Sequence, residues 1–126
     1  MIAIFLALLL NIYEAQVIRV VDGDTVDVRI AVWLDLHQTA RIRIRGLDTP
    51  ELKGECENER GLARMAQAFA MMNIGQKVFV TAVDYDKFGG RYDADVRLAS
   101  GKLLSELLIE NRLARSYNGG KRQSWC

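Results

Sequence analysis

The sequence is short of proline, cysteine, aromatic residues and excess charge, and each shortage narrows the possibilities. Its 126 residues include one proline, two cysteines and no internal repeat, and half of them are hydrophobic, as expected of one domain with one packed core. With 17 basic and 16 acidic side chains, the net charge of +1 lacks the basic excess of a dedicated nucleic-acid binder. Aromatics are only 8% of residues, which argues against single-strand binding by base stacking.

The charges are unevenly distributed along the chain. Residues 48–59 carry five acids against one lysine, whereas residues 112–122 carry four basic residues and no acid. This separation suggests one region that attracts cations and one that can approach phosphate. Alternatively, both regions are ordinary solvent-exposed surfaces that bind no ligand.

The chain also lacks an apolar run of the roughly 20 residues that a membrane span needs. The apolar stretch at residues 1–10 has the size of a signal-peptide core, although no basic residue precedes it and no small-x-small cleavage site follows. We expect residues 1–15 to be a signal peptide or apolar leader and residues 16–126 to form a single domain. The protein is then secreted or periplasmic, or anchored by this segment. A cytoplasmic protein with a misassigned start is the alternative.

The two cysteines, Cys56 and Cys126, stand among polar residues and are therefore available for pairing. In an oxidising compartment their disulfide would close a loop of about 70 residues and stabilise the fold by roughly 4 kcal/mol. Two free surface thiols in a reducing cytosol are the alternative.

Alternating hydrophobic residues predict a mainly antiparallel β protein. The predicted strands are 16–22, 25–33, 40–46, 77–83 and 91–98, with a loop at 34–39 and an irregular tail at 118–126. In the third strand, Ile42 and Ile44 should point inward and Arg41, Arg43 and Arg45 outward.

Helical spacing predicts two helices, one over 57–73 that ends at Gly75 and one over 103–111. The predicted apolar face of the first is Leu62, Met65, Ala66, Phe69, Met72 and Asn73, and that of the second is Leu104, Leu107 and Leu108. Three strands, a helix, two strands and a helix are the order of a five-stranded Greek-key OB-fold barrel, which is one option among α+β folds.

Three acids follow turns at the ends of predicted strands. Asp24 ends an Asp-Gly-Asp turn, and Asp48 and Glu51 follow the third strand. If these strand ends meet, carboxylate oxygens without histidine or cysteine would favour Ca²⁺ or Mg²⁺ over zinc. Alternatively, each acid only forms hydrogen bonds with the backbone of its own turn and binds no metal.

Arginine binds phosphate oxygens through two parallel hydrogen bonds and stays charged at any working pH. Arg41, Arg43 and Arg45 share one strand face, and periodicity does not tell which of them contacts a ligand. Arg91 begins a strand after a double glycine. Alternatively, the first three arginines only cover a solvent-exposed sheet face, and Arg91 is a charged residue on an edge strand that contacts no ligand.

Four segments together resemble one known family. They are VVDGDTV (20–26), RIRGLDTPE (43–51), DKFGGR (86–91) and KLLSELLIENRLAR (102–115). In this order and spacing, residues 17–117 resemble the staphylococcal nuclease (thermonuclease) family. The resemblance implies an OB-fold barrel with two flanking helices and a Ca²⁺-dependent phosphodiesterase acting on DNA and RNA, with Mg²⁺ as a possible substitute. It implies no stable protein partner and a monomer.

The resemblance assigns metal-site roles by position. Asp24 and Asp48 match the calcium carboxylates, and Thr49 matches the residue whose carbonyl oxygen faces the ion. Glu51 matches the acid that deprotonates or orients the attacking water. Asp22 matches an acid that lies next to the metal ligands without binding the metal itself.

The resemblance also assigns substrate contacts. Arg43 and Arg91 match the two arginines that clamp the phosphate, and the family cleaves to leave 3′-phosphate ends. Lys87 matches a lysine that contacts the nucleotide, and Tyr117 lies one position from a tyrosine that packs on it.

The chain departs from the family near these residues. A double glycine at 89–90 stands where one glycine is usual, Phe88 replaces a tyrosine, and a short acidic segment follows Glu51 in place of a lysine-rich loop. We therefore expect weak non-specific binding to polyanions. The alternative function is a non-catalytic nuclease-like domain that binds nucleic acid or protein. Such domains lose the acids and arginines that this chain has.

Overall fold

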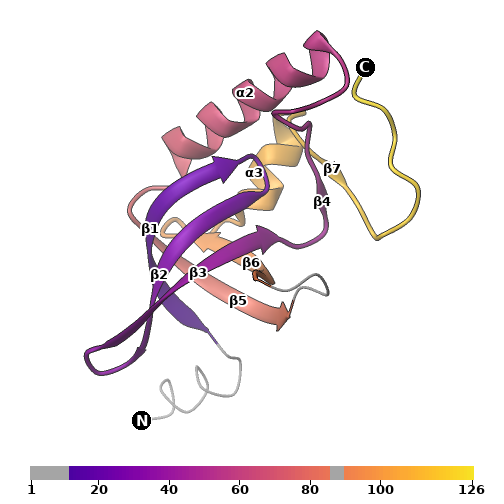
Figure 1. Ribbon diagram of the computed structural model, residues 1–126. Coiled ribbons are helices and arrows are strands. Elements are labelled where there is room, and N and C mark those ends of the chain that lie inside the picture. The colour runs from indigo at the N-terminus through magenta and orange to yellow at the C-terminus, as the bar shows by residue number, and fades with distance from the viewer. Residues whose placement is uncertain (1–11, 86–89) are drawn as a thin grey trace.

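The computed structural model, which describes residues 12–85 and 90–126, has five strands that close into a barrel in the order β1-β2-β3-β6-β5 (Figure 1). The strands are β1 (Tyr13–Asp22), β2 (Thr25–Trp33), β3 (Leu36–Ile44), β5 (Lys77–Tyr85) and β6 (Tyr92–Leu98). Strands β3 and β6 pair in parallel, and the other neighbours are antiparallel. The predicted α+β class and five-stranded OB-fold barrel are confirmed.

The starts of β1 and β3 differ most from the sequence prediction, and the other strand boundaries agree with it to within two residues. Strand β1 begins at Tyr13, and its first residues pair with β5 from Val80 to Lys77. Residues 36–39 were predicted as a loop, which is wrong, because they pair with β2. Their side chains are all exposed. This end of the β2–β3 hairpin has no buried face, so it lacks the alternation that identifies a strand.

The third strand alternates as predicted. Ile42 and Ile44 are almost fully buried, whereas the side chains of Arg41, Arg43 and Arg45 retain between 28% and 43% of their exposure. Because a one-residue slip would reverse these two faces, the pairing of β3 with β2 and β6 fixes which way the arginines point.

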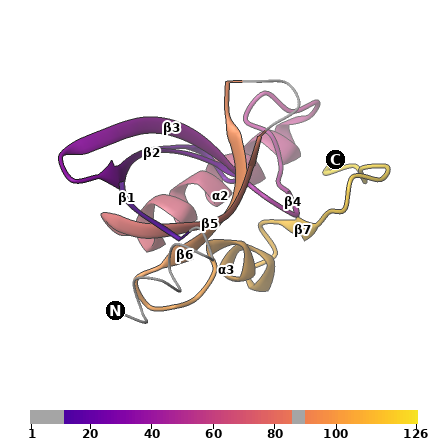
Figure 2. The same ribbon diagram turned by 90° about the horizontal axis from the view of Figure 1, so that it is seen from below.

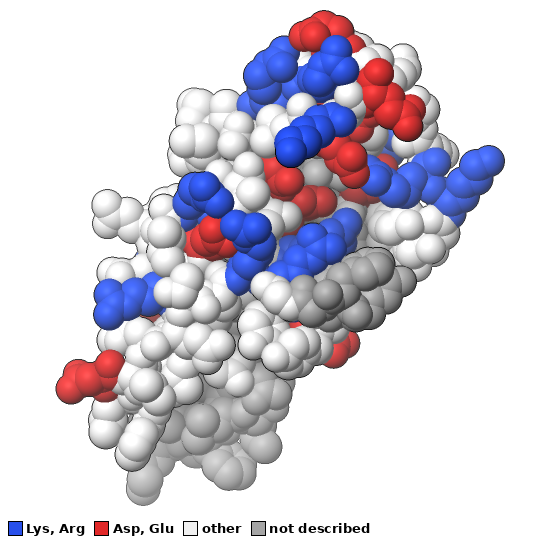
Figure 3. Space-filling model, viewed as in Figure 1, with Lys and Arg blue, Asp and Glu red and all other residues white. Residues whose placement is uncertain are grey.

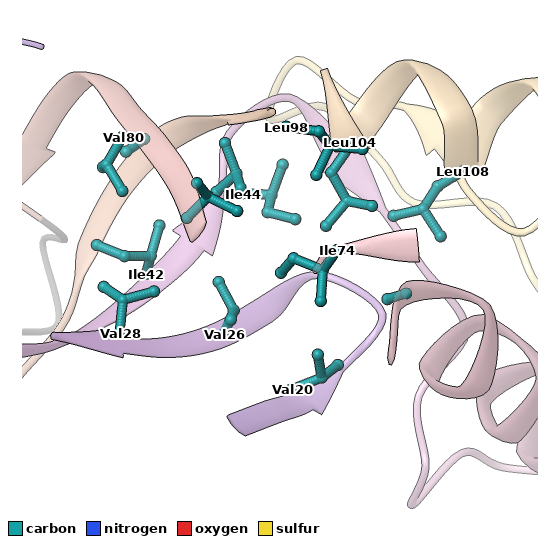
Figure 4. Packing of buried hydrophobic residues seen from close by; sticks show 14 of the residues in the cluster. Val20, Val26, Val28, Ile42, Ile44, Ile74, Val80, Leu98, Leu104 and Leu108 are labelled. Atoms are coloured by element: carbon teal, nitrogen blue, oxygen red, sulfur yellow. The ribbon is translucent and has the colours of Figure 1, made fainter. Parts of the chain in front are cut away.

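The core fills the barrel and continues beyond it to the helices. Figure 4 shows Val28, Ile42 and Val80 inside the barrel, with Leu104 and Leu108 extending the same cluster toward the helices. All five side chains are buried. Leu104 and Leu108 belong to α3 (Leu104–Glu110), and Leu107 is partly buried against the cluster, as predicted for this helix.

Helix α2 (Glu57–Asn73) has the predicted bounds, but the predicted buried face is wrong in part. Its buried side chains are Glu59, Ala63, Ala66 and Ala70, whereas Met65 and Met72 are exposed. One of these small residues, Ala66, faces the β1–β2 turn, where a Cβ on Gly23 would lie 3.0 Å from the Ala66 Cβ. A larger side chain would not fit this approach, so ranking residues by hydrophobicity alone predicts part of the face wrongly.

The C-terminal segment returns to the start of α2. Strand β7 (Arg115–Ser116) pairs with β4 (Leu47–Asp48), and Figures 1 and 2 both show the residues after β7 on the side of β4. A disulfide joins Cys126 to Cys56, the N-cap of α2, with 6.0 Å between their Cα atoms. No helix in the described part of the chain is long and apolar enough to cross a membrane.

Replacing Gly61 with alanine is expected to raise the free energy of unfolding by about 0.5–1 kcal/mol, because glycine is a poor helix former. Gly61 lies inside α2, and a Cβ there would meet only the Arg64 Nη2 atom, at 3.7 Å. Urea denaturation measures the change. Gly75→Ala is the matched control, because Gly75 has a φ of +71° and its replacement should destabilise the protein. A loss of stability in Gly61→Ala would contradict the helix packing described here.

Candidate active site

The β1–β2 turn and the end of β3 bring Asp24 next to Arg43. Thr25 pairs with Arg43 across the two strands, and the Ile44 amide donates to the Asp24 carbonyl oxygen at 2.7 Å. The Arg43 guanidinium lies 3.6 Å from the Asp24 carboxylate, whose other oxygen accepts from the Thr25 hydroxyl. The turn is held to α2 by a hydrogen bond from the Gln67 amide to the Val21 carbonyl oxygen.

These elements line an open cleft of about 540 Å³, within the range of pockets that hold small ligands. Its lining residues are Val21, Asp22, Asp24, Thr25, Arg43, Thr49, Pro50, Glu51, Leu52, Lys53, Arg91 and Arg122. Six of the residues singled out from the sequence therefore share one cleft, namely Asp22, Asp24, Arg43, Thr49, Glu51 and Arg91. Asp48 is buried and is not among the residues that line it. Figure 3 shows acidic side chains in the middle of this face of the molecule, with basic side chains around them.

Burial, together with the hydrogen bond to Asp24 and its negative charge, raises the pKa of Asp22 to about 7. The Asp22 carboxylate also accepts the Asp24 backbone amide at 3.1 Å. Through this hydrogen bond Asp22 shapes the turn that presents Asp24 to the cleft.

The segment from Asp48 to Glu51 is held by a buried acid that the sequence analysis did not identify. Glu59 in the first turn of α2 is 7% exposed, and its two carboxylate oxygens accept the backbone amides of Glu51 and Glu55 at 3.1 and 3.2 Å. A Cβ on Gly54 would lie 2.5 Å from the Glu59 side chain, so the loop closes tightly around it. The available signal was Cys56 followed three residues later by glutamate, the spacing of a capping box.

Replacing Glu59 with alanine is expected to lower the free energy of unfolding by about 2–4 kcal/mol, because two amides would lose a charged acceptor. Thermal or urea denaturation measures this loss. Glu57→Ala is the matched control, since Glu57 is exposed in the same helical turn and forms exposed ion pairs with Arg60 and Arg64. Equal stability of the two variants would show that Glu59 does not hold the loop.

The structure separates Arg41 and Arg43 of β3 from each other and from Arg45, which directly follows the strand. Arg41 donates to Asp27 at 2.8 and 3.1 Å, and this bond is the main reason that the pKa of Asp27 is lowered. Arg45 lies 3.5 Å from Asp84. Arg43 is the one of the three that lines the cleft.

Arg91 also lines the cleft and directly precedes β6, at the loop end of the β5–β6 hairpin. Tyr85 and Tyr92 pair across this hairpin with their rings 4.9 Å apart, and Gly90 has a φ of +76° that glycine adopts without strain. Lys87 lies outside the described residues. Tyr117 does not line the cleft, and its hydroxyl donates to the Gly120 carbonyl oxygen at 2.6 Å.

Arg122, from the irregular tail, contacts the acids of the site and was missed by the sequence analysis. Its guanidinium donates to Asp48 Oδ1, to Glu51 Oε1 at 2.9 Å and to the Thr49 carbonyl oxygen at 3.4 Å. The hydrogen bond to Glu51, with those to Asp48, raises the pKa of Arg122 above its usual range. The basic composition of the tail was a signal, but nothing in the sequence indicated where the tail lies.

The oxygen donors in the cleft, together with the buried Asp48 beside it, fit a hard divalent cation. No cluster of three or more acidic, histidine or cysteine side chains suited to a metal was found among the described residues. However, two carboxylates and a backbone carbonyl, from Asp24, Asp48 and Thr49, are oxygen donors of the kind that Ca²⁺ and Mg²⁺ take. Asp48 and Thr49 already hold one positive group, the guanidinium of Arg122, so this position accepts a cation.

Comparison with known proteins agrees with this geometry. Residues 41–124 match the family described as Staphylococcal nuclease homologue, and this span contains most of the cleft residues. The chain belongs to this family. It is also 32% identical over 112 residues to "Micrococcal nuclease" of Shigella flexneri, covering 83% of this chain, and 34% identical over 76 residues to "Protein ParB" of Escherichia coli, covering 60% of it.

As a staphylococcal nuclease homologue, the chain carries a nuclease-like domain. It spans 59% of the Shigella protein and 37% of the Escherichia coli protein, so it corresponds to part of each relative. The family match begins at Arg41, and the residues before it include Asp22 and Asp24, which the barrel brings into the same cleft.

Proposed function

We propose that the protein is a metal-dependent nuclease that hydrolyses phosphodiester bonds of DNA, RNA or both. The observation that carries this proposal is the meeting of carboxylates and arginines in one open cleft, where Asp24 and Glu51 lie with Arg43 and Arg91. Carboxylates alone would repel an anionic substrate. A cleft that also has two arginines can bind a phosphate between them and a metal ion.

Asp24, Asp48 and the Thr49 carbonyl oxygen would hold the metal, for which Ca²⁺ is our first candidate and Mg²⁺ the second. A bound divalent cation would neutralise phosphate charge and polarise a phosphate oxygen. Asp48 is 4% exposed and Thr49 is 3% exposed, so their donor atoms are held in place by the surrounding fold.

Arg43 and Arg91 bind the phosphate oxygens of the bond to be cleaved and stabilise the charge that develops there in the transition state. Arg43 is suited to this because β2 and β6 pair with its strand on both sides and fix its backbone. Glu51, which is 58% exposed, positions or deprotonates the attacking water. We propose cleavage of the bond to the 5′ oxygen, which leaves a 3′-phosphate.

An end-labelled oligonucleotide tests this reaction. We expect the purified protein with Ca²⁺ to produce fragments with 3′-phosphate ends, which lose their phosphate to a 3′-phosphatase and change mobility. Fragments with 3′-hydroxyl ends would contradict the proposed bond. A folded protein that binds the oligonucleotide without cleaving it would instead support the non-catalytic binding domain.

We also propose that the protein works outside the cytosol as a monomer. The disulfide between Cys56 and Cys126 supports an oxidising compartment, where such bonds persist. Alkylation of free thiols in protein taken directly from the cell, followed by mass spectrometry, tests the location. Fully alkylated cysteines would contradict export.

A further inference from the structure

We propose that Arg122 is a tethered cation that competes with the metal for Asp48 and so sets the metal affinity of the site. This inference rests on the proposed metal-dependent function, which assigns Asp48 and the Thr49 carbonyl oxygen to the metal. Arg122 is 74 residues from Asp48 in sequence, yet three of its nitrogen atoms contact this short segment and Glu51.

The competition is for the same atoms. Two nitrogens of Arg122 donate to Asp48 Oδ1, one of them Nε at 2.8 Å, and a third donates to Glu51 Oε1 at 2.9 Å. Arg122 Nη2 also lies 3.4 Å from the Thr49 carbonyl oxygen. A metal on Asp48 Oδ1 and this carbonyl would need the lone pairs that the guanidinium uses, and two cations at one carboxylate repel. Metal binding therefore requires Arg122 to withdraw.

The tail that carries Arg122 is fastened to the molecule by the residues that directly follow it. The Trp125 indole donates to Asp48 Oδ2 at 3.2 Å, and the Asn58 amide donates to the Trp125 carbonyl oxygen at 3.0 Å. Arg115 lies over the Trp125 ring at 3.7 Å from its centre. The disulfide of Cys126 follows directly. Such fastening keeps Arg122 at a high effective concentration beside Asp48, so it competes more strongly than a free cation.

Calcium binding measured by calorimetry tests the proposal, in wild type and in Arg122→Ala. Without the competing guanidinium, we expect the dissociation constant for Ca²⁺ to fall by at least about fivefold, the lower end of typical coupling between ligands. Lys121→Ala is the matched control, because it removes the same charge from the exposed neighbouring position. Its dissociation constant should change much less.

The outcomes separate this inference from the proposed function. Equal affinity in Arg122→Ala and Lys121→Ala would overturn the competition while leaving the metal site intact. Weaker binding in Arg122→Ala would also overturn it, because Arg122 would then position Asp48 for the metal. Absence of Ca²⁺ binding in all three folded proteins would overturn both the inference and the proposed metal site.

Removal of the disulfide tests the tether, and melting experiments guard against a folding defect in Arg122→Ala. Replacing both Cys56 and Cys126 with serine keeps a good N-cap on α2 and frees the tail, so Ca²⁺ affinity should rise in wild type but not in the Arg122→Ala background. In melting experiments, Arg122→Ala should unfold at a lower temperature than wild type without Ca²⁺, and saturating Ca²⁺ should narrow this gap. A gap that stays constant would contradict competition at Asp48.

Discussion

Replacing Arg43 with alanine is expected to lower the rate of phosphodiester cleavage by about 10²–10³-fold, the typical cost of removing one donor that stabilises transition-state charge. Arg43 is the β3 arginine that lines the cleft, and its guanidinium lies 3.6 Å from Asp24. Arg43→Lys keeps the charge but loses the planar pair of donors, so most of the loss should remain. Steady-state cleavage of a labelled oligonucleotide at saturating Ca²⁺ measures both variants.

Arg41→Ala is the matched control for Arg43. It removes an arginine from the same face of the same strand, two residues away, but its guanidinium pairs with Asp27 outside the cleft. We expect nearly unchanged activity and a loss of stability below about 1 kcal/mol, as for an exposed ion pair. If Arg41→Ala lost as much activity as Arg43→Ala, the separation of the arginines in the structure would be wrong.

Replacing Glu51 with glutamine is expected to lower the rate constant of cleavage by about 10²–10⁴-fold, the usual contribution of a general acid or base. The amide keeps the size of the side chain but cannot accept a proton from water. Because the Glu51 backbone amide is held by Glu59, the position of the side chain should be preserved. Single-turnover cleavage at saturating Ca²⁺ separates this effect from substrate binding.

Glu55→Gln is the matched control for Glu51, since it makes the same change in a nearby acid whose backbone amide is also held by Glu59. It should cleave at nearly the wild-type rate, because Glu55 does not line the cleft that holds the arginines. Glu51→Gln with wild-type activity would rule out the acid role of Glu51. It would leave the phosphate-binding role of Arg43 untouched.

The barrel could be predicted because its strands have one buried and one exposed face. Ile42 and Ile44 alternate with arginines, and strand β2 has the bounds that its pattern indicates. Residues 36–39 could not be identified in this way, since all four side chains are exposed. Periodicity reports burial, and a hairpin end without a buried face gives no such signal.

The buried face of α2 could not be predicted because close packing favours small side chains there. Ala63, Ala66 and Ala70 are buried, while the larger Met65 and Met72 are exposed. The reason is the approach of the β1–β2 turn at Gly23, which is a tertiary contact. A hydrophobic pattern ranks methionine above alanine, so it places Met65 and Met72 on the buried face and leaves out Ala63 and Ala70.

The cleft was predictable as far as its residues lie in short motifs. Asp24, Asp48 and Glu51 follow strand ends, and only the resemblance to a family selected Arg43 among the three arginines of its strand. Arg122 lies in a glycine-rich tail without periodicity, and its position depends on contacts of Trp125 and Cys126 with distant residues. Such contacts between segments far apart in sequence leave no local pattern.

The most direct test of the proposed function is digestion of plasmid DNA and of RNA by the purified, disulfide-bonded protein, in Ca²⁺, in Mg²⁺ and in EDTA. We predict digestion of at least one substrate in Ca²⁺, and its complete loss in EDTA with recovery when excess Ca²⁺ is restored. Digestion that persists in EDTA, or none under any condition by a protein shown to be folded, would contradict a metal-dependent nuclease.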